Sequence, residues 1–142
     1  MGGAPIEASR DTCLQQAVAE CLGENEEEGG IILSKGFRYE FIKLRNVHTG
    51  TPTAVCLFEV DPQEYGDKIL PKILEDGFKS FGSFHTHPTG CRALPSTTDL
   101  NKLFKGFANN FIWSPSTGEF NWFVFSHVDP DGRYHWKMWN LL

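Results

Sequence analysis

Two histidines and an aspartate in the middle of the chain have the types and spacing of metal ligands. His85 and His87 are separated by one residue, and alternate side chains of a β-strand point to the same face, so both imidazoles can reach one point. Asp99 follows twelve residues after His87, in the first turn of a helix that Pro95-Ser96 is expected to begin. Two imidazoles and one carboxylate suit zinc better than magnesium or calcium, and three protein ligands leave a position for water, as in catalytic zinc sites.

The same residues allow simpler interpretations. An H-x-H pair on a strand also occurs as two polar residues on an exposed face, and the segment from Ser96 to Asp99 fits a capping box that only closes the helix start. That alternative explains the serine and the aspartate but not the histidines. A second pair, His127 and Asp129, precedes a turn and is a weaker metal candidate. We interpret Cys91 as a packing residue, because a fourth protein ligand would close the site.

Strands and helices alternate around these residues. Apolar periodicity predicts a helix over about residues 10–22, a helical segment over 61–76 that Pro71 interrupts, and a helix that begins at Pro95-Ser96. Runs of β-branched and aromatic residues bounded by turn residues predict strands at 31–33, 37–44, 54–60, 80–85, 110–113, 120–126 and 133–139. The expected fold class is mixed α/β (α+β), with one curved sheet flanked by helices, in a single domain over residues 1–142.

Composition and charge exclude several classes of protein. The chain is 40% hydrophobic, enough for a core, and its 18 acidic and 13 basic residues give a net charge of -5, which argues against a nucleic-acid partner. No apolar run is long enough to span a membrane, and the first residues do not resemble a signal peptide. The four cysteines form no C-x-x-C pair, so a deaminase centre is excluded and reduced thiols in the cytoplasm are expected.

The string His85-Thr86-His87-Pro88, followed by Ser96-Thr97-Thr98-Asp99, resembles the signature of the JAB/MPN family of JAMM zinc metalloproteases. That signature is a glutamate, then HxHP, then a serine, two residues and an aspartate. Glu27 matches the glutamate, because it stands three residues before Gly30, which opens an aliphatic run. The resemblance covers about residues 10–107. One departure is the loop from Pro88 to Pro95, which has eight residues where family members usually have seven.

The resemblance implies a fold, a cofactor and an activity. The fold would be the JAB/MPN fold, which is similar to that of cytidine deaminases. The cofactor would be Zn²⁺ held by His85, His87 and Asp99, which lowers the pKa of its bound water toward roughly 7. The activity would be hydrolysis of a peptide or isopeptide bond, typically after the C-terminal glycine of a ubiquitin-like protein or in its conjugates. The compact chain looks like the stand-alone prokaryotic or phage members of the family.

Two further residues receive roles from the resemblance. Glu27 would act as the general base and acid, and its acidic neighbours Glu26 and Glu28 are expected to raise its pKa in the direction that this work requires. Ser96 would donate a hydrogen bond to the oxyanion of the tetrahedral intermediate.

Two other functions remain open. A non-catalytic MPN-like scaffold would only bind partners, but such proteins typically have a degraded motif and this chain retains each element. A RadC-like role in genome maintenance is suggested by the similar H-P-x-G and P-S-x-x-D patterns, although the acidic charge argues against direct contact with DNA. The oligomeric state is not predicted.

Overall fold

The computed structural model describes residues 5–22, 27–47, 60–88, 90–97 and 99–141. In this part of the chain the helical elements are α1 (Pro5–Glu20), α2 (Pro62–Lys68), α3 (Leu70–Leu74), the π-helix η1 (Asp99–Leu103) and the 3-10 helix η2 (Phe104–Gly106). The strands are β1 (Gly29–Lys35), β2 (Arg38–Leu44), β3 (Lys79–Thr86), β4 (Asn109–Ser114), β5 (Glu119–Val128) and β6 (Tyr134–Asn140).

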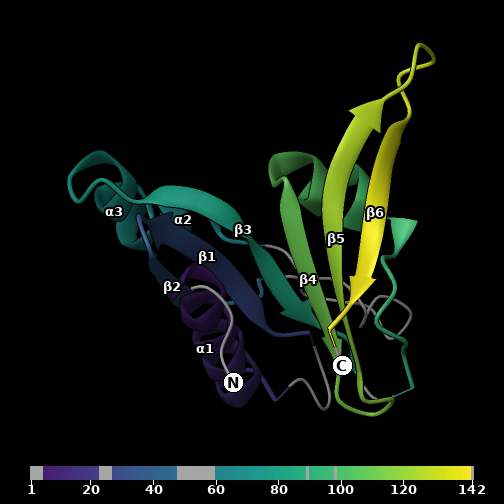
Figure 1. Cartoon of the computed structure of the whole chain (residues 1–142), viewed down its shortest axis with the longest axis horizontal. Coiled ribbons are helices and arrows are strands. Elements are labelled where there is room, and N and C mark those ends of the chain that lie inside the picture. The colour runs from purple at the N-terminus through teal and green to yellow at the C-terminus, as the bar shows by residue number, and fades with distance from the viewer. Residues whose placement is uncertain (1–4, 23–26, 48–59, 89, 98, 142) are drawn as a thin grey trace.

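These strands form one mixed sheet, which confirms the predicted class. Its order is β2-β1-β3-β4-β5-β6 (Figure 1). Strands β3 and β4 run parallel, and the other neighbouring strands pair antiparallel. The parallel pair requires a crossover, and η1 and η2 lie on it, directly after the predicted metal-binding strand.

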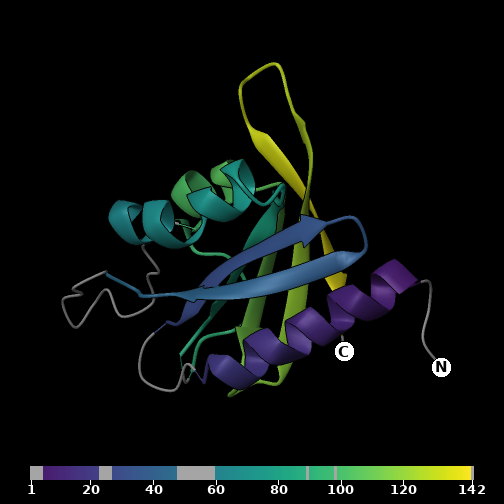
Figure 2. The same cartoon turned by 90° about the vertical axis from the view of Figure 1, so that its left-hand side faces the viewer.

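Helices cover both faces of the sheet, and strand alternation explains how. Ile32 packs in the same cluster as Leu14 of α1, whereas Ile31 and Leu33 pack in another cluster with Ile69, which lies between α2 and α3. Successive residues of a strand point to opposite faces. Figure 2 accordingly shows α1 on one side of the sheet and the other helices on the opposite side.

The observed elements differ from the predictions in a few places. Helix α1 begins at Pro5 and ends at Glu20, so Leu22 lies beyond it and is 64% exposed. The predicted interruption of the 61–76 segment is confirmed, but it lies at Ile69, and Pro71 belongs to the first turn of α3. Of the predicted strand 54–60, residues 54–59 lie outside the described residues, while Val60 forms a bridge to Asn46.

A helical segment follows Pro95-Ser96 as predicted, but it is not a regular α-helix. The segment forms a π-helix and then a 3-10 turn, and the backbone is extended again at Phe107 (φ -140°, ψ 134°). The chain must leave the helix there because β4 begins two residues later, at Asn109, alongside β3. The buried Phe104 packs in one cluster with Leu100 and Leu103.

Two glycines allow β1 to lie unusually close to its neighbours. A Cβ atom on Gly29 would lie 2.1 Å from the backbone oxygen of Phe84, and one on Gly30 would lie 2.0 Å from that of Ile42. Any side chain at these positions would push the strands apart. Gly29 pairs with His85, so this close packing brings Glu27, two residues before β1, to the end of β3.

The far edge of the sheet is rich in exposed apolar side chains. On β6, Met138 is 53% and Trp139 is 55% exposed.

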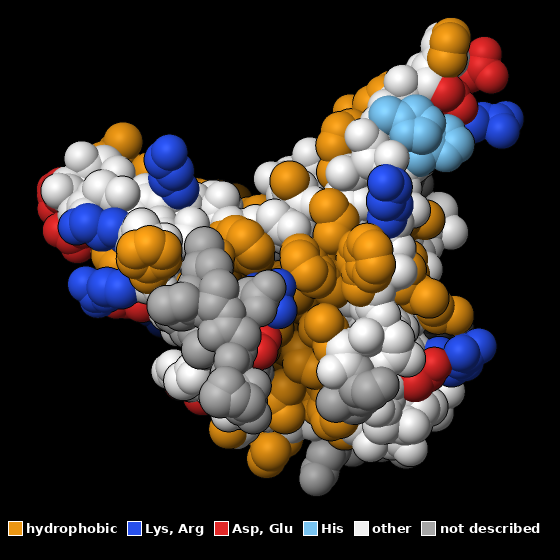
Figure 3. Space-filling model, viewed as in Figure 1, with side chains coloured by type: hydrophobic (Ala, Val, Ile, Leu, Met, Phe, Trp, Pro, Cys, Tyr) orange, Lys and Arg blue, Asp and Glu red, His pale blue; other side chains and the backbone are white. Residues whose placement is uncertain are grey.

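Figure 3 shows apolar side chains gathered in the hollow between the α2–α3 end and the projecting β5–β6 hairpin. Among the described helices, none has the length and apolarity needed to cross a lipid bilayer.

Candidate metal centre

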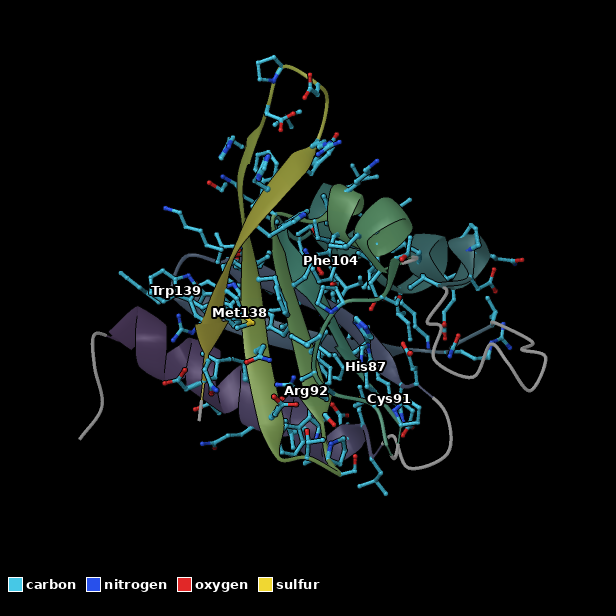
Figure 4. The ribbon with its side chains drawn as sticks, turned by 90° about the vertical axis from the view of Figure 1, so that its right-hand side faces the viewer. His87, Cys91, Arg92, Phe104, Met138 and Trp139 are labelled. Carbon is cyan, nitrogen blue, oxygen red and sulfur yellow. The ribbon has the colours of Figure 1, made fainter. Side chains whose placement is uncertain are left out.

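Four residues from three separate parts of the chain meet at the end of strand β3. His85 belongs to β3, His87 follows that strand, Asp99 begins η1, and Glu27 precedes β1. Their ligand atoms all lie within 4.8 Å of one another, and all four side chains are buried. Figure 4 shows His87 beyond the end of the strand, next to the loop that carries Cys91 and Arg92. The structure therefore brings together all of the predicted ligands and the predicted base.

Three of the four ligand atoms form a nearly equilateral triangle. His85 Nε2 lies 3.2 Å from His87 Nε2 and 3.2 Å from Asp99 Oδ2, and His87 Nε2 lies 3.3 Å from the same carboxylate oxygen. In a tetrahedral site with ligands at about 2.0–2.1 Å, two ligand atoms are separated by about 3.3–3.4 Å. These side chains are thus spaced as the ligands of a small divalent cation, and the group could hold a metal ion.

Glu27 lies beside the triangle without belonging to it. Its Oε1 is 3.7 Å from His85 Nε2, longer than the edges of the triangle. The side chain is fully buried, and within the described part of the chain neither carboxylate oxygen has a hydrogen-bond partner. A buried carboxylate without partners is costly, so the site is incomplete unless a cation, a water molecule or a substrate group occupies it.

Backbone contacts hold Glu27 in this position. The Thr86 amide donates to the Glu28 carbonyl at 2.8 Å, and the Glu28 amide donates back to Thr86 Oγ1 at 3.0 Å. Asn46 Nδ2 donates to the carbonyl oxygen of Glu27 itself, also at 3.0 Å. Sequence reasoning missed Thr86 and Asn46, although a hydroxyl residue between the two histidines was a visible signal.

The pKa of Glu27 is raised to about 9, which is the direction expected from the sequence. The expected contribution of Glu28 was wrong, because Glu28 is not among the causes of the shift. Burial is the main cause and the charge of Asp99 is the second. The acidic neighbour Glu28 instead pairs with Lys43 at 2.8 Å, and Glu26 lies outside the described residues.

Asp99 serves in a capping box and in the ligand triangle at once. The Ser96 amide donates to Asp99 Oδ2 at 2.9 Å, and the Asp99 amide donates to Ser96 Oγ at 3.0 Å. The two interpretations of this segment are therefore compatible. Burial alone would raise the pKa of Asp99, but the two imidazoles and the Ser96 amide lower it below its ordinary range. The half-buried Ser96 hydroxyl accepts here and still carries its own hydrogen to donate.

The other nitrogen of His87 fixes the orientation of its ring. His87 Nδ1 lies 2.6 Å from the carbonyl oxygen of Arg92. A carbonyl can only accept, so Nδ1 carries the hydrogen and Nε2 offers its lone pair to the centre. Histidine ligands of metals are commonly oriented by a contact of this kind.

The loop between Pro88 and Pro95, which is one residue longer than the family pattern, is tied to the sheet. Ser114 Oγ donates to the Cys91 carbonyl, and Asn121 Nδ2 donates to the Ala93 carbonyl at 2.9 Å. Cys91 is half-buried and does not belong to the buried ligand group.

The second predicted pair, His127 and Asp129, lies elsewhere. Both residues belong to the β5–β6 hairpin; His127 is exposed and stacks on His135, with ring centroids 4.5 Å apart and planes 9° apart. Asp129 accepts from His135 Nε2 at 2.9 Å. Among the described residues, the group around His85 is the one that gathers three or more potential metal ligands.

Comparisons with known proteins identify a similar fold. Neither the protein-family models nor the curated proteins include a match to this chain. A solution structure of protein DSY2949 from Desulfitobacterium hafniense is similar, with a TM-score of 0.56 and 21% sequence identity over 89% of this chain and 86% of that one. At this identity the likeness concerns the fold alone.

Proposed function

We propose that this protein is a zinc-dependent hydrolase of the JAMM type, which cleaves a peptide or isopeptide bond. The observation that carries the proposal is the buried triangle of His85, His87 and Asp99, with ligand atoms 3.2–3.3 Å apart and the partnerless carboxylate of Glu27 beside it. A structural ion would need no such neighbour, whereas hydrolysis needs a group that moves a proton.

The donor set favours zinc among the common cations. Two imidazole nitrogens and one carboxylate oxygen form a known catalytic zinc set, whereas magnesium and calcium take oxygen ligands. When bound, zinc lowers the pKa of a water molecule toward about 7 and polarises a carbonyl group. The chain's own residues must then handle the proton and the developing charge.

Glu27 is the proposed proton carrier. A nearby cation favours the ionised form of a carboxylate, so Glu27, whose pKa is about 9 without metal, becomes a base when the centre is loaded. It accepts a proton from the attacking water as the oxygen–carbon bond forms. It then gives that proton to the leaving amine as the carbon–nitrogen bond breaks, and the residue returns to its starting state.

Ser96 is the proposed oxyanion donor. Its oxygen already accepts from the Asp99 amide, which orients the hydroxyl near the triangle while leaving its hydrogen available for a substrate. A hydrogen bond to the carbonyl oxygen of the scissile bond strengthens as negative charge develops there.

The proposed substrate is the extended C-terminal tail of a ubiquitin-like protein or its conjugate. A groove of about 470 Å³ opens beside Glu27 between β2 and α2, and its walls include Lys43, Arg45 and Glu64. An extended tail that lies along a strand edge would reach the centre with its last peptide bond. A cytoplasmic location is also proposed, and it fits the free cysteines Cys13 and Cys21.

The proposal is tested with a fusion of a ubiquitin-like protein to a fluorogenic amine. The zinc-loaded protein should release the fluorophore, chelator should stop release, and added zinc should restore it. Stable binding of the fusion without cleavage, at any zinc concentration, would instead favour the non-catalytic scaffold. Salt-sensitive binding to duplex DNA would favour the genome-maintenance alternative.

A further inference from the structure

We propose that Glu119, at the start of β5, is a positioning residue of the metal centre that acts on His87 through one peptide group. The inference rests on the metal site of the proposed function. Nothing in the sequence motif involves Glu119, which lies twenty residues after Asp99 and outside the buried ligand group.

Glu119 accepts hydrogen bonds from the loop between Pro88 and Pro95 and from its own turn. Its Oε1 accepts from Arg92 Nε at 3.2 Å, from the Ala93 amide at 3.4 Å and from Thr117 Oγ1 at 3.1 Å. Its Oε2 accepts from Arg92 Nη2 at 2.8 Å. The Arg92 fork and the carboxylate therefore meet in a two-point contact with defined geometry.

The decisive feature is the peptide group that joins Arg92 to Ala93. Its N–H donates to Glu119, and its C=O accepts from His87 Nδ1 at 2.6 Å. The described chain contains no cis peptide bond, so these two groups point in opposite directions within one rigid plane. When Glu119 fixes the direction of the N–H, it also fixes the carbonyl that selects the tautomer and the orientation of His87.

The contact between Arg92 and Glu119 is too exposed to contribute much to the stability of the fold. The Arg92 side chain is 66% exposed, and exposed ion pairs contribute little to folding. A purely structural role would therefore predict only a small effect of removing Glu119. The pKa of Glu119 is lowered to about 2, chiefly by the Arg92 hydrogen bond, so the acceptor is ionised at neutral pH.

The test compares zinc affinity in Glu119→Ala, Glu119→Gln and a matched control, Glu40→Ala. Glu40 also pairs with an arginine and one further donor, Arg38 and Lys72, and its side chain is 27% exposed against 24% for Glu119. Zinc affinity is measured by competition with a chelating dye, and the unfolding of each metal-free variant is recorded beside it.

Glu119→Ala should weaken zinc binding by about 10–100-fold, the usual effect of losing a contact that orients a ligand. Glu119→Gln keeps a carbonyl oxygen for the Ala93 amide and should recover most of the affinity, and Glu40→Ala should bind as the wild type does. In ¹⁵N spectra of the metal-free protein, His87 should lose its single Nδ1–H tautomer in Glu119→Ala only.

Three outcomes would overturn the inference, and they are distinguishable. If the wild type binds zinc and Glu119→Ala binds it equally well with an unchanged His87 spectrum, the positioning role is wrong while the metal site stands. If the wild type binds no zinc, the proposed function fails and the inference fails with it. A similar loss of affinity in Glu40→Ala would show that the effect is general destabilisation, which also contradicts the positioning role.

Discussion

The chain contains two groups of two histidines and one aspartate, and they differ in almost every physical respect. At the candidate metal centre, His85, His87 and Asp99 are buried and point their potential ligand atoms at one another. At the tip of the β5–β6 hairpin, the rings of His127 and His135 lie face to face, and the histidines of this hairpin are visible on the surface in Figure 3.

The difference shows what residue type alone cannot supply. A ligand atom must be held with its lone pair directed at the common point and away from water. The Arg92 carbonyl holds His87 through its other ring nitrogen, and the Ser96 amide donates to the Asp99 oxygen that belongs to the triangle. On the hairpin, Asp129 uses one carboxylate oxygen to accept from two backbone amides of its own turn and the other to bind a histidine, so it completes a turn.

The largest expected contrast comes from removing the aspartate of each group. Asp99→Ala should lower zinc affinity by more than about 100-fold, because the loss of a ligand exceeds the loss of an orienting contact, and zinc-dependent cleavage should disappear. Asp129→Ala should change zinc affinity by less than about twofold. Dye competition measures both, and equal affinities in the two variants would refute the contrast between the groups.

Substitution of Glu27 distinguishes proton transfer from metal binding. Glu27→Gln should lower the rate of cleavage by about 10²–10⁴-fold, the usual contribution of a general base, while zinc remains bound. Glu28→Gln, which alters the ion pair with Lys43, should cost less than about tenfold. Steady-state rates with the fluorogenic fusion provide the measurement, and full activity of Glu27→Gln would remove the proposed base.

Substitution of Ser96 tests whether this residue of the capping box also contributes to catalysis. Ser96→Ala should reduce kcat by about 10²–10³-fold through loss of the oxyanion donor and reduce stability by about 1 kcal/mol through loss of the cap. Kinetics and denaturant unfolding on the same samples separate these effects. A loss of stability with kcat unchanged would leave Ser96 as a cap only.

A further expected effect is on the pH dependence of stability in the metal-free protein. Because the pKa of Glu27 is raised from its ordinary value to about 9 on folding, the native state holds a proton that the unfolded state has lost. The stability from this group is full below about pH 4.5 and falls as pH rises toward 9, by at most about 1.4 kcal/mol per pH unit.

The hairpin carboxylate should behave in the opposite way. The pKa of Asp129 is lowered, chiefly by its hydrogen bond from His135, so its contribution is present at neutral pH and is lost only as pH falls through the acid range. Urea unfolding in chelator from pH 5 to 9 should give a flatter profile for Glu27→Gln than for the wild type, and an unchanged slope for Asp129→Ala. Identical profiles for the wild type and Glu27→Gln would contradict the raised pKa.

Local sequence signals were sufficient for much of the fold and for the grouping of the candidate ligands. The alternation of His85 and His87 on a strand and the serine–aspartate spacing are properties of neighbouring residues, and the structure brings these side chains together. The mixed sheet also followed from the interleaved strand and helix patterns.

What the sequence could not predict depends on contacts between distant segments. The raised pKa of Glu27 comes from burial and from Asp99, which lies 72 residues away in the chain. The Arg92–Ala93 peptide group has no side-chain signature, since any residue supplies the same carbonyl and amide. The irregular helix after Ser96 results from the need to enter β4 beside β3.

The proposed function requires that the triangle of His85, His87 and Asp99 hold one zinc ion. Zinc K-edge X-ray absorption of the wild-type protein, with metal content measured on the same sample, tests this requirement. We expect one zinc per chain with two imidazole ligands at about 2.0–2.1 Å, the remaining ligands being oxygen and none sulfur. A protein that takes up no zinc, or a spectrum with sulfur at about 2.3 Å, would contradict it.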